Sequence, residues 1–288
     1  MHSVFQIVSL ILRISIIAQV FATGLGTTLR EATYLFRQPR RLLNSILARN
    51  VAVPIIAVLL IKSFSLHVAA SLAIGILAVT PVPPLLPKSQ LKAGGRSNYV
   101  LGLLVSQAVL AIVLVPITIR IMDLAFNTGI RFSAGQVASI VLTSILIPLA
   151  AGRLASKLLP GLQQFAPFLL TVGTVLLIVG TIPLLYLAWR SLIVIAGNGA
   201  LLALSIFIVA GTAVGHLFGG PSTEDRGTLG VATSARHPAI AIAVAQANFP
   251  DQTALVAGTV VIYLLLRLVL EIPYIRWLRK ARALTTPA

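Results

Sequence analysis

The feature of this chain that most constrains its fold is the recurrence of long apolar runs between Val4 and Ile275. Nine runs can be separated, and most are about 20 residues long, the length that an α-helix needs to cross a bilayer. Hydrophobic residues make up 58% of the chain and charged residues only 10%, whereas a soluble domain carries about 25% charged residues. The sequence therefore predicts an all-α polytopic membrane protein.

The nine predicted transmembrane helices cover about 4–25, 43–63, 67–86, 99–125, 135–153, 165–187, 191–215, 228–248 and 252–275. The first run has a second interpretation, because Val20-Phe21-Ala22 resembles a signal-peptide cleavage site. Arg13 interrupts that run and no basic stretch precedes it, which favours a membrane helix. The loops are short and contain no polar linker, so residues 1–288 are expected to form a single transmembrane domain.

The net charge of +16 reflects the placement of Lys and Arg in short loops. Most of them fall on one side of the predicted bilayer, among them Arg40, Arg153 and Arg279. The other side carries little more than Lys62, Arg120, Arg131 and Arg190. Because positive loops stay in the cytoplasm, we predict a multi-pass protein of the inner membrane with its N-terminus outside and its C-terminus inside. The charge then indicates topology in a lipid bilayer, with no nucleic-acid partner.

The composition leaves little material for catalysis. The chain has no cysteine and only six acidic residues, which excludes thiolate metal sites and disulfides. The predicted helices contain no pair of carboxylates and no serine, histidine and aspartate set. The sequence therefore predicts no enzyme, no metal site and no cofactor.

Two of the predicted helices contain interruptions that a regular helix does not tolerate. The third ends in four prolines within residues 81–87, and each proline lacks a backbone donor and crowds the preceding turn. The eighth contains Thr233, Ser234, Arg236, His237 and Pro238 between apolar stretches. By the predicted topology the two helices run in opposite directions. This pattern is typical of inverted-repeat transporters, in which two broken helices cross near the membrane midplane.

At these residues the chain resembles the bile acid:sodium symporter family, also called the sodium/bile acid cotransporter-like family. The resemblance is carried in order by Gly24-Leu25, residues 35–40, residues 48–54, the break at 80–88 and the break at 232–237. It covers almost the whole chain, which looks like a divergent bacterial-type member lacking the family's first helix. The resemblance implies a panel, about 4–25 and 135–187, and a core, about 43–125 and 191–275. Substrate would bind between them, and movement of the core against the panel would give alternating access.

The departures from the family pattern concern sodium. Ala232 stands where the family has a glutamate, and Arg236 and Arg49 stand where it has glutamines. Prolines and leucines replace the family's serine and asparagine in the first break. A guanidinium has no acceptor atom and repels a cation. The family's sodium sites are therefore expected to be absent.

The candidate substrate and coupling residues follow from the two breaks and from Arg49 in the second predicted helix. They are Arg49, Pro81, Pro83, Pro84, Lys88, Thr233, Ser234, Arg236, His237 and Pro238. Two roles stay open for the two arginines, donation to carbonyls freed at the breaks and direct binding of an anion. Likewise His237 either carries a coupling proton or is a neutral structural group. Arg267 is expected to snorkel or pair locally, and Glu271 to lie at a helix end.

The sequence therefore predicts a secondary transporter that moves a small organic anion by alternating access without the family's sodium sites. Two alternatives remain at this point. One is a sodium-coupled symporter of bile-acid-like anions, and the other is a membrane receptor or scaffold that does not transport.

Overall fold

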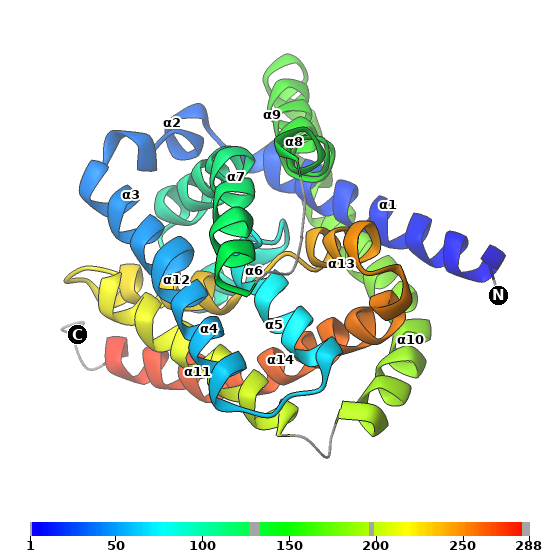
Figure 1. The fold of residues 1–288 in the computed structure, drawn as a ribbon. Helices are drawn as coiled ribbons and strands as arrows, with labels where there is room; N and C mark the ends of the chain where they lie inside the picture. The colour runs from blue at the N-terminus through cyan, green and yellow to red at the C-terminus, as the bar shows by residue number, and fades with distance from the viewer. Residues whose placement is uncertain (1, 127–132, 196–198, 284–288) are drawn as a thin grey trace.

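The computed structural model describes residues 2–126, 133–195 and 199–283, and within these ranges the chain is helical with no strand (Figure 1). Six of its helical segments are long and apolar enough to cross a membrane: Pro39–Ser63, Ser97–Leu124, Ala134–Leu158, Pro160–Pro183, Ala200–Phe218 and Pro250–Ala281. Two shorter apolar helices cover Leu10–Gly26 and Val68–Val79. The predicted class, an all-helical multi-pass membrane protein, is confirmed, while the number of nine crossings stays a prediction.

The first half of the chain contains seven α-helices and two short helical turns. They are α1 (His2–Gly26), α2 (Leu29–Ala32), η1 (Leu35–Arg37), α3 (Pro39–Ile46), η2 (Leu47–Ala52), α4 (Val53–Ser63), α5 (Val68–Val79), α6 (Leu86–Lys92) and α7 (Ser97–Phe126). The η2 segment is a π-helical turn that joins α3 to α4 without a loop. The break expected at the end of the third predicted helix is an unwound stretch between α5 and α6. The π turn η2 lies inside the second predicted helix, where no interruption was predicted.

The second half repeats the same kinds of element. It contains α8 (Ala134–Val141), the π turn η3 (Leu142–Leu146), α9 (Ile147–Leu158), η4 (Pro160–Phe165), α10 (Ala166–Ile195), α11 (Ala200–Phe218), α12 (Thr223–Ser234), α13 (Pro238–Asn248), η6 (Pro250–Gln252) and α14 (Thr253–Ala283). In both π turns a proline follows shortly after, Pro54 after η2 and Pro148 after η3. A proline lacks the N–H that an ordinary turn needs, so a widened turn before it is a physical consequence.

The predicted boundary between the sixth and seventh helices differs from the structure. The predicted end at 187 and the predicted start at 191 are both wrong, because α10 continues to Ile195 and α11 begins at Ala200. Trp189 and Arg190 lie between the two predicted helices, but in the structure both are exposed residues of α10. Arg131, which we assigned to the outer side, lies outside the described residues.

Helix α1 packs closely against α9 and α10. All three helices fall largely within the predicted panel. A Cβ atom on Gly24 of α1 would overlap the backbone oxygen of Leu149, and one on Gly152 of α9 would overlap that of Phe21. The Ser15 hydroxyl donates to the Gly173 carbonyl of α10 over 2.6 Å. Small residues let these helix backbones approach one another, as is usual in membranes. The division into a moving panel and core stays a prediction.

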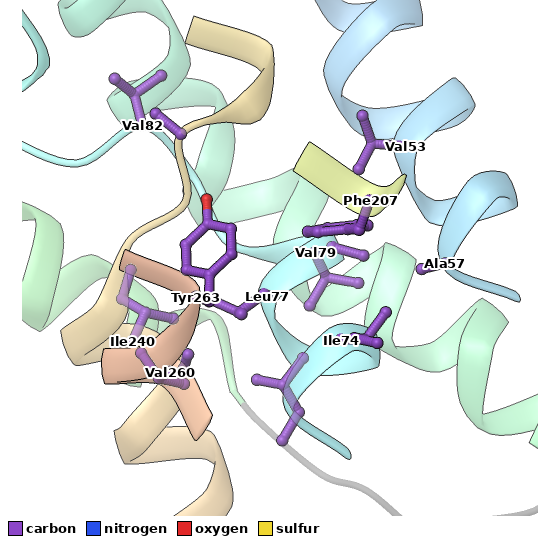
Figure 2. Packing of buried hydrophobic residues seen from close by; sticks show 14 of the residues in the cluster. Val53, Ala57, Ile74, Leu77, Val79, Val82, Phe207, Ile240, Val260 and Tyr263 are labelled. Carbon is purple, nitrogen blue, oxygen red and sulfur yellow. The ribbon is translucent and has the colours of Figure 1, made fainter. Parts of the chain in front are cut away.

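The hydrophobic core lies between the two chain halves, where α5 meets α11, α13 and α14. Figure 2 shows Leu77 and Val79 of α5 beside Phe207 of α11 and Tyr263 of α14. The Phe207 and Tyr263 rings are tilted with centroids 6.2 Å apart, a favourable arrangement for aromatic pairs. This packing fixes the part of α14 that lies beside the breaks.

A charged cluster joins the start of α12 to the first turn of α3 and to the loop before α7. The Asp225 carboxylate is buried and lies 3.1 Å from the Arg41 guanidinium and 2.5 Å from that of Arg96. The hydrogen bond to Asp225 raises the pKa of Arg96. Arg41 also lies over the ring of Tyr99, 5.7 Å from its centroid. Residues 41, 96 and 225 therefore lie on the same side of the molecule.

Candidate functional site

The first break separates α5 from α6. Thr80 is extended (φ −75°, ψ 150°), and the chain stays unwound to Leu85, with Pro81 and Pro84 buried and Pro83 partly exposed. Pro87 lies in the first turn of α6, where a proline needs no helical donor. The unwound stretch is therefore shorter than the predicted 81–87.

The second break separates α12 from α13. Thr233 and Ser234 are the last residues of α12, contrary to the prediction that they are unwound, and the Thr233 hydroxyl donates back to Leu229. The extended stretch begins at Ala235, and His237 is the N-cap of α13. Pro238 follows as the first helical residue, where its missing N–H costs nothing.

The two breaks touch each other. The backbone N–H of His237 donates to the Thr80 hydroxyl over 3.0 Å. The Arg236 guanidinium donates to the carbonyl oxygens of Ala78 and Thr80, both at 3.2 Å. Carbonyls at the end of a helix have no partner within it, so Arg236 satisfies the end of α5 from the other half of the chain.

Arg49 joins the same centre from the π turn. Its Nη2 donates to the Ala235 carbonyl over 3.3 Å, and its own carbonyl accepts from Nη1 and Nη2 of Arg236 at 3.3 Å. In a π turn the partner of this carbonyl would be residue 54, which is a proline without N–H. Pro54 thus frees the carbonyl that Arg236 binds. Arg49, Arg236 and both breaks form one hydrogen-bonded unit, which we call the arginine centre.

The arginine centre is buried, and several of its N–H groups have no hydrogen-bond partner among the described residues. Arg49 is 0% exposed and Arg236 1%. Among the described residues, Nε and Nη1 of Arg49, Nε of Arg236 and Nε2 of His237 have no hydrogen-bond partner. A guanidinium offers only donors. The centre can therefore take further carbonyl or anionic oxygens, whereas it offers nothing to a cation.

His237 has a structural partner. Its Nδ1 accepts from the backbone N–H of Ile240 over 3.4 Å and so caps the first turn of α13. An accepting Nδ1 is unprotonated, so the ring is a neutral imidazole with its proton on Nε2. This contact favours the structural role over the coupling role.

Helix α14 adds three residues to this region that the sequence analysis did not select. The Tyr263 hydroxyl donates to the carbonyl of Ser234, and its oxygen points toward the unwound chain in Figure 2. The Ser234 hydroxyl lies 3.1 Å from the Glu271 carboxylate, and Arg267 Nη2 lies 2.5 Å from the same oxygen. The placement of Glu271 at a helix end was wrong, since it is 4% exposed beside the break. Arg267 pairs locally, as one of its two expected roles.

A signal for these residues was present in the sequence. Tyr263, Arg267 and Glu271 recur every four residues within an apolar run, and this spacing places side chains on one face of a helix. Lys88, in contrast, lies exposed on α6, where its Nζ donates to the Thr174 hydroxyl of α10 over 3.0 Å. This contact joins Lys88 to the predicted panel.

The absence of the family's sodium sites stays a prediction, and two observations bear on it. Ala232 is buried and has no side-chain oxygen. Within the described part of the chain no group of three or more His, Cys, Asp or Glu residues is placed to hold a metal ion. The buried charges near the second break are three arginines and one carboxylate, that of Glu271.

Comparison with known proteins supports the family resemblance. The family model described as the Sodium Bile acid symporter family matches residues 13–205, which is more than half of the chain. The search of curated proteins found no match to the chain. The matched range contains Arg49 and the first break, and it ends before the second break. The chain belongs to the sodium bile acid symporter family.

Proposed function

We propose that this protein is a secondary transporter that moves a small organic anion by alternating access and binds no sodium. The observation that carries the proposal is the arginine centre, in which two buried guanidinium groups join the two helix breaks and retain unpartnered donors. Membership of a transporter family supports transport, and the spare N–H groups support an anionic substrate.

The absence of sodium follows from charge and ligand type. Sodium is a hard cation that needs several oxygen ligands. The carbonyls of Ala78, Thr80 and Arg49 are already occupied by Arg236. A cation at hydrogen-bond distance from two guanidinium groups would also meet strong repulsion in a low-dielectric interior. The fixed charges hold the breaks together permanently, which is the task we assign to sodium in related proteins.

The proposed orientation places the N-terminus outside and the C-terminus in the cytoplasm of the inner membrane. The contact of Asp225 with Arg41 and Arg96 supports it, because three loops that the charge pattern assigns to the cytoplasm meet there. We further propose that α1, α8, α9 and α10 form the panel and that the two breaks belong to the core. The close packing of α1 on α9 and α10 supports this division.

Transport is tested by counterflow of labelled taurocholate and labelled benzenesulfonate in proteoliposomes. Both probes carry a sulfonate, which stays ionised and crosses lipid poorly without a carrier. We expect saturable counterflow of at least one probe, and a loss of about tenfold or more in Arg49→Gln, since one charge-assisted hydrogen bond is worth about 1.5 to 3 kcal/mol. Arg190→Gln, which removes an exposed arginine of α10, is the matched control and should keep the wild-type rate.

Two results would contradict the proposal. Saturable binding of a probe to purified protein without any flux would identify a receptor. Equal flux in liposomes with and without the protein would show that the protein does not transport these anions.

A further inference from the structure

Helix α14 presents a polar face inside an otherwise apolar span. Tyr263, Arg267 and Glu271 are 0%, 8% and 4% exposed, respectively. A buried ionisable residue in a membrane span is costly and is usually retained for a function. The role of the Glu271 carboxylate is not explained by the arginine centre, which is held together by carbonyls.

Glu271 is tied to the end of a broken helix. Its Oε1 lies 3.1 Å from the hydroxyl of Ser234, the last residue of α12. The same hydroxyl lies 3.2 Å from the Val231 carbonyl. An ionised Glu271 accepts a hydrogen bond from the serine hydroxyl. A protonated Glu271 donates a hydrogen bond to the serine oxygen, and the serine hydroxyl then donates to the Val231 carbonyl. Ser234 therefore has a partner in either state, and a change at Glu271 is passed directly to the second break.

Glu271 also forms an ion pair with Arg267 of the same helix. Arg267 Nη2 is 2.5 Å from Glu271, yet its Nε and Nη2 have no aligned hydrogen-bond partner among the described residues. The pair is thus a charge contact without the two parallel hydrogen bonds that strengthen an arginine–carboxylate pair. Protonation of Glu271 removes its negative charge and so weakens its attraction to Arg267.

The titratable groups in the region around Glu271 come from α14, the arginine centre and α11. Arg267 and Tyr274 lie on α14 itself, Arg49 on η2, and Arg236 and His237 in the second break. His216 of α11 is bonded to the Tyr274 hydroxyl over 2.9 Å. The acidic residues of α12 lie at its far end, where Asp225 is occupied by Arg41 and Arg96. Helix α5 has no titratable side chain, and Tyr186 and Arg190 of α10 are exposed.

We propose that Glu271 is the proton-binding group that couples anion transport to protons, an inference that rests on the proposed function. The step is the binding of one proton to the Glu271 carboxylate on one side of the membrane and its release on the other. An anion at the arginine centre repels the ionised carboxylate and so favours its protonated form. By reciprocity, protonation of Glu271 strengthens anion binding. The two ligands then travel together.

The first test measures protonation itself and needs no transport. Infrared difference spectra of the protein in nanodiscs at low and high pH should show a protonated-carboxyl band in wild type. The band should also grow at constant pH when taurocholate or benzenesulfonate is added, since a sulfonate contributes no carboxyl signal. Glu271→Gln should lose the part of this band that grows on anion addition, and Asp123→Asn, which removes another buried carboxylate, should retain it. A band that persists unchanged in Glu271→Gln would overturn the proposal.

The second test measures coupling. An inward proton gradient should drive accumulation of the probe by about tenfold for each pH unit if one proton accompanies one monovalent anion. Glu271→Gln should keep counterflow and lose gradient-driven accumulation, while His216→Gln should keep both. Gradient-driven accumulation by Glu271→Gln at the wild-type level would contradict the role of Glu271 and leave the proposed function intact. Absence of all uptake by wild type would instead contradict the proposed function.

A third variant keeps the proposal testable if Glu271→Gln does not fold. Ser234→Ala retains the carboxylate and removes only the hydroxyl that links it to α12. We expect the pH midpoint of the carboxyl band to rise, because the charge-assisted hydrogen bond that the ionised carboxylate loses is stronger than the neutral one that the protonated form loses. An unchanged midpoint would show that Ser234 and Glu271 are not linked, which contradicts the proposed coupling path.

Discussion

Replacement of Arg236 by alanine is expected to cause the largest loss of stability of any single substitution at the candidate site. The change leaves the carbonyls of Arg49, Ala78 and Thr80 without their donors in a region closed to water. Each unsatisfied buried group costs about 1 to 3 kcal/mol. Relief of repulsion between the two guanidinium groups acts in the opposite direction. Because three carbonyls lose their donor, we expect the free energy of unfolding to fall by about 3 kcal/mol or more.

A thermal unfolding series in detergent measures this effect. A loss of 3 kcal/mol corresponds to a decrease of roughly 6 to 12 °C in Tm for a chain of this size. Arg236→Lys keeps the charge and removes the planar fork, so it should recover only part of the loss. Arg190→Ala is the exposed control and should leave Tm unchanged. An Arg236→Ala protein as stable as wild type, or more stable, would mean that charge repulsion outweighs the carbonyl contacts.

The second large effect is expected from the addition of a single methyl group to α1. In Gly24→Ala the new Cβ would overlap the backbone oxygen of Leu149 and lie 3.1 Å from the Cα of Gly152. A backbone cannot move aside as a side chain can, so the two helices must separate. Such overpacking costs about 1 to 3 kcal/mol, even though alanine favours a helix by about 1 kcal/mol over glycine.

The matched control lies two residues further along the same helix. A Cβ on Gly26 meets nothing within 4 Å, so Gly26→Ala should be neutral or slightly stabilising. Gly152→Ala should reproduce the loss, because its Cβ would overlap the backbone oxygen of Phe21. The three Tm values relative to wild type check the account. A Gly24→Ala protein that matches Gly26→Ala would show that α1 and α9 do not approach as closely as described.

The sequence predicted the helix breaks because prolines and clustered polar groups act locally. Pro81, Pro83 and Pro84 remove donors wherever they are placed, so the end of α5 could be predicted without knowing its neighbours. The edges were less accurate, since a proline is tolerated in a first helical turn and Thr233 can bond to its own helix. Where a helix resumes depends on caps that a simple pattern does not reveal.

Residues that act through long-range contacts were harder to predict. Arg49 and Arg236 stood out as isolated charges in apolar runs, but their exchange of hydrogen bonds links positions 187 residues apart. Glu271 was not selected, because its position in the apolar run does not show which neighbouring helix its side chain contacts. Its four-residue spacing from Arg267 indicated a shared face, and only the packing of α14 beside α12 brings that face to Ser234.

The central claim is that the arginine centre replaces bound sodium. The most direct measurement is counterflow of labelled taurocholate or benzenesulfonate in proteoliposomes, with sodium replaced by choline at constant ionic strength. If the guanidinium groups of Arg49 and Arg236 hold the two breaks together, the rate and the half-saturating concentration should be the same in both media. A large loss of counterflow in choline that millimolar sodium restores would contradict the account.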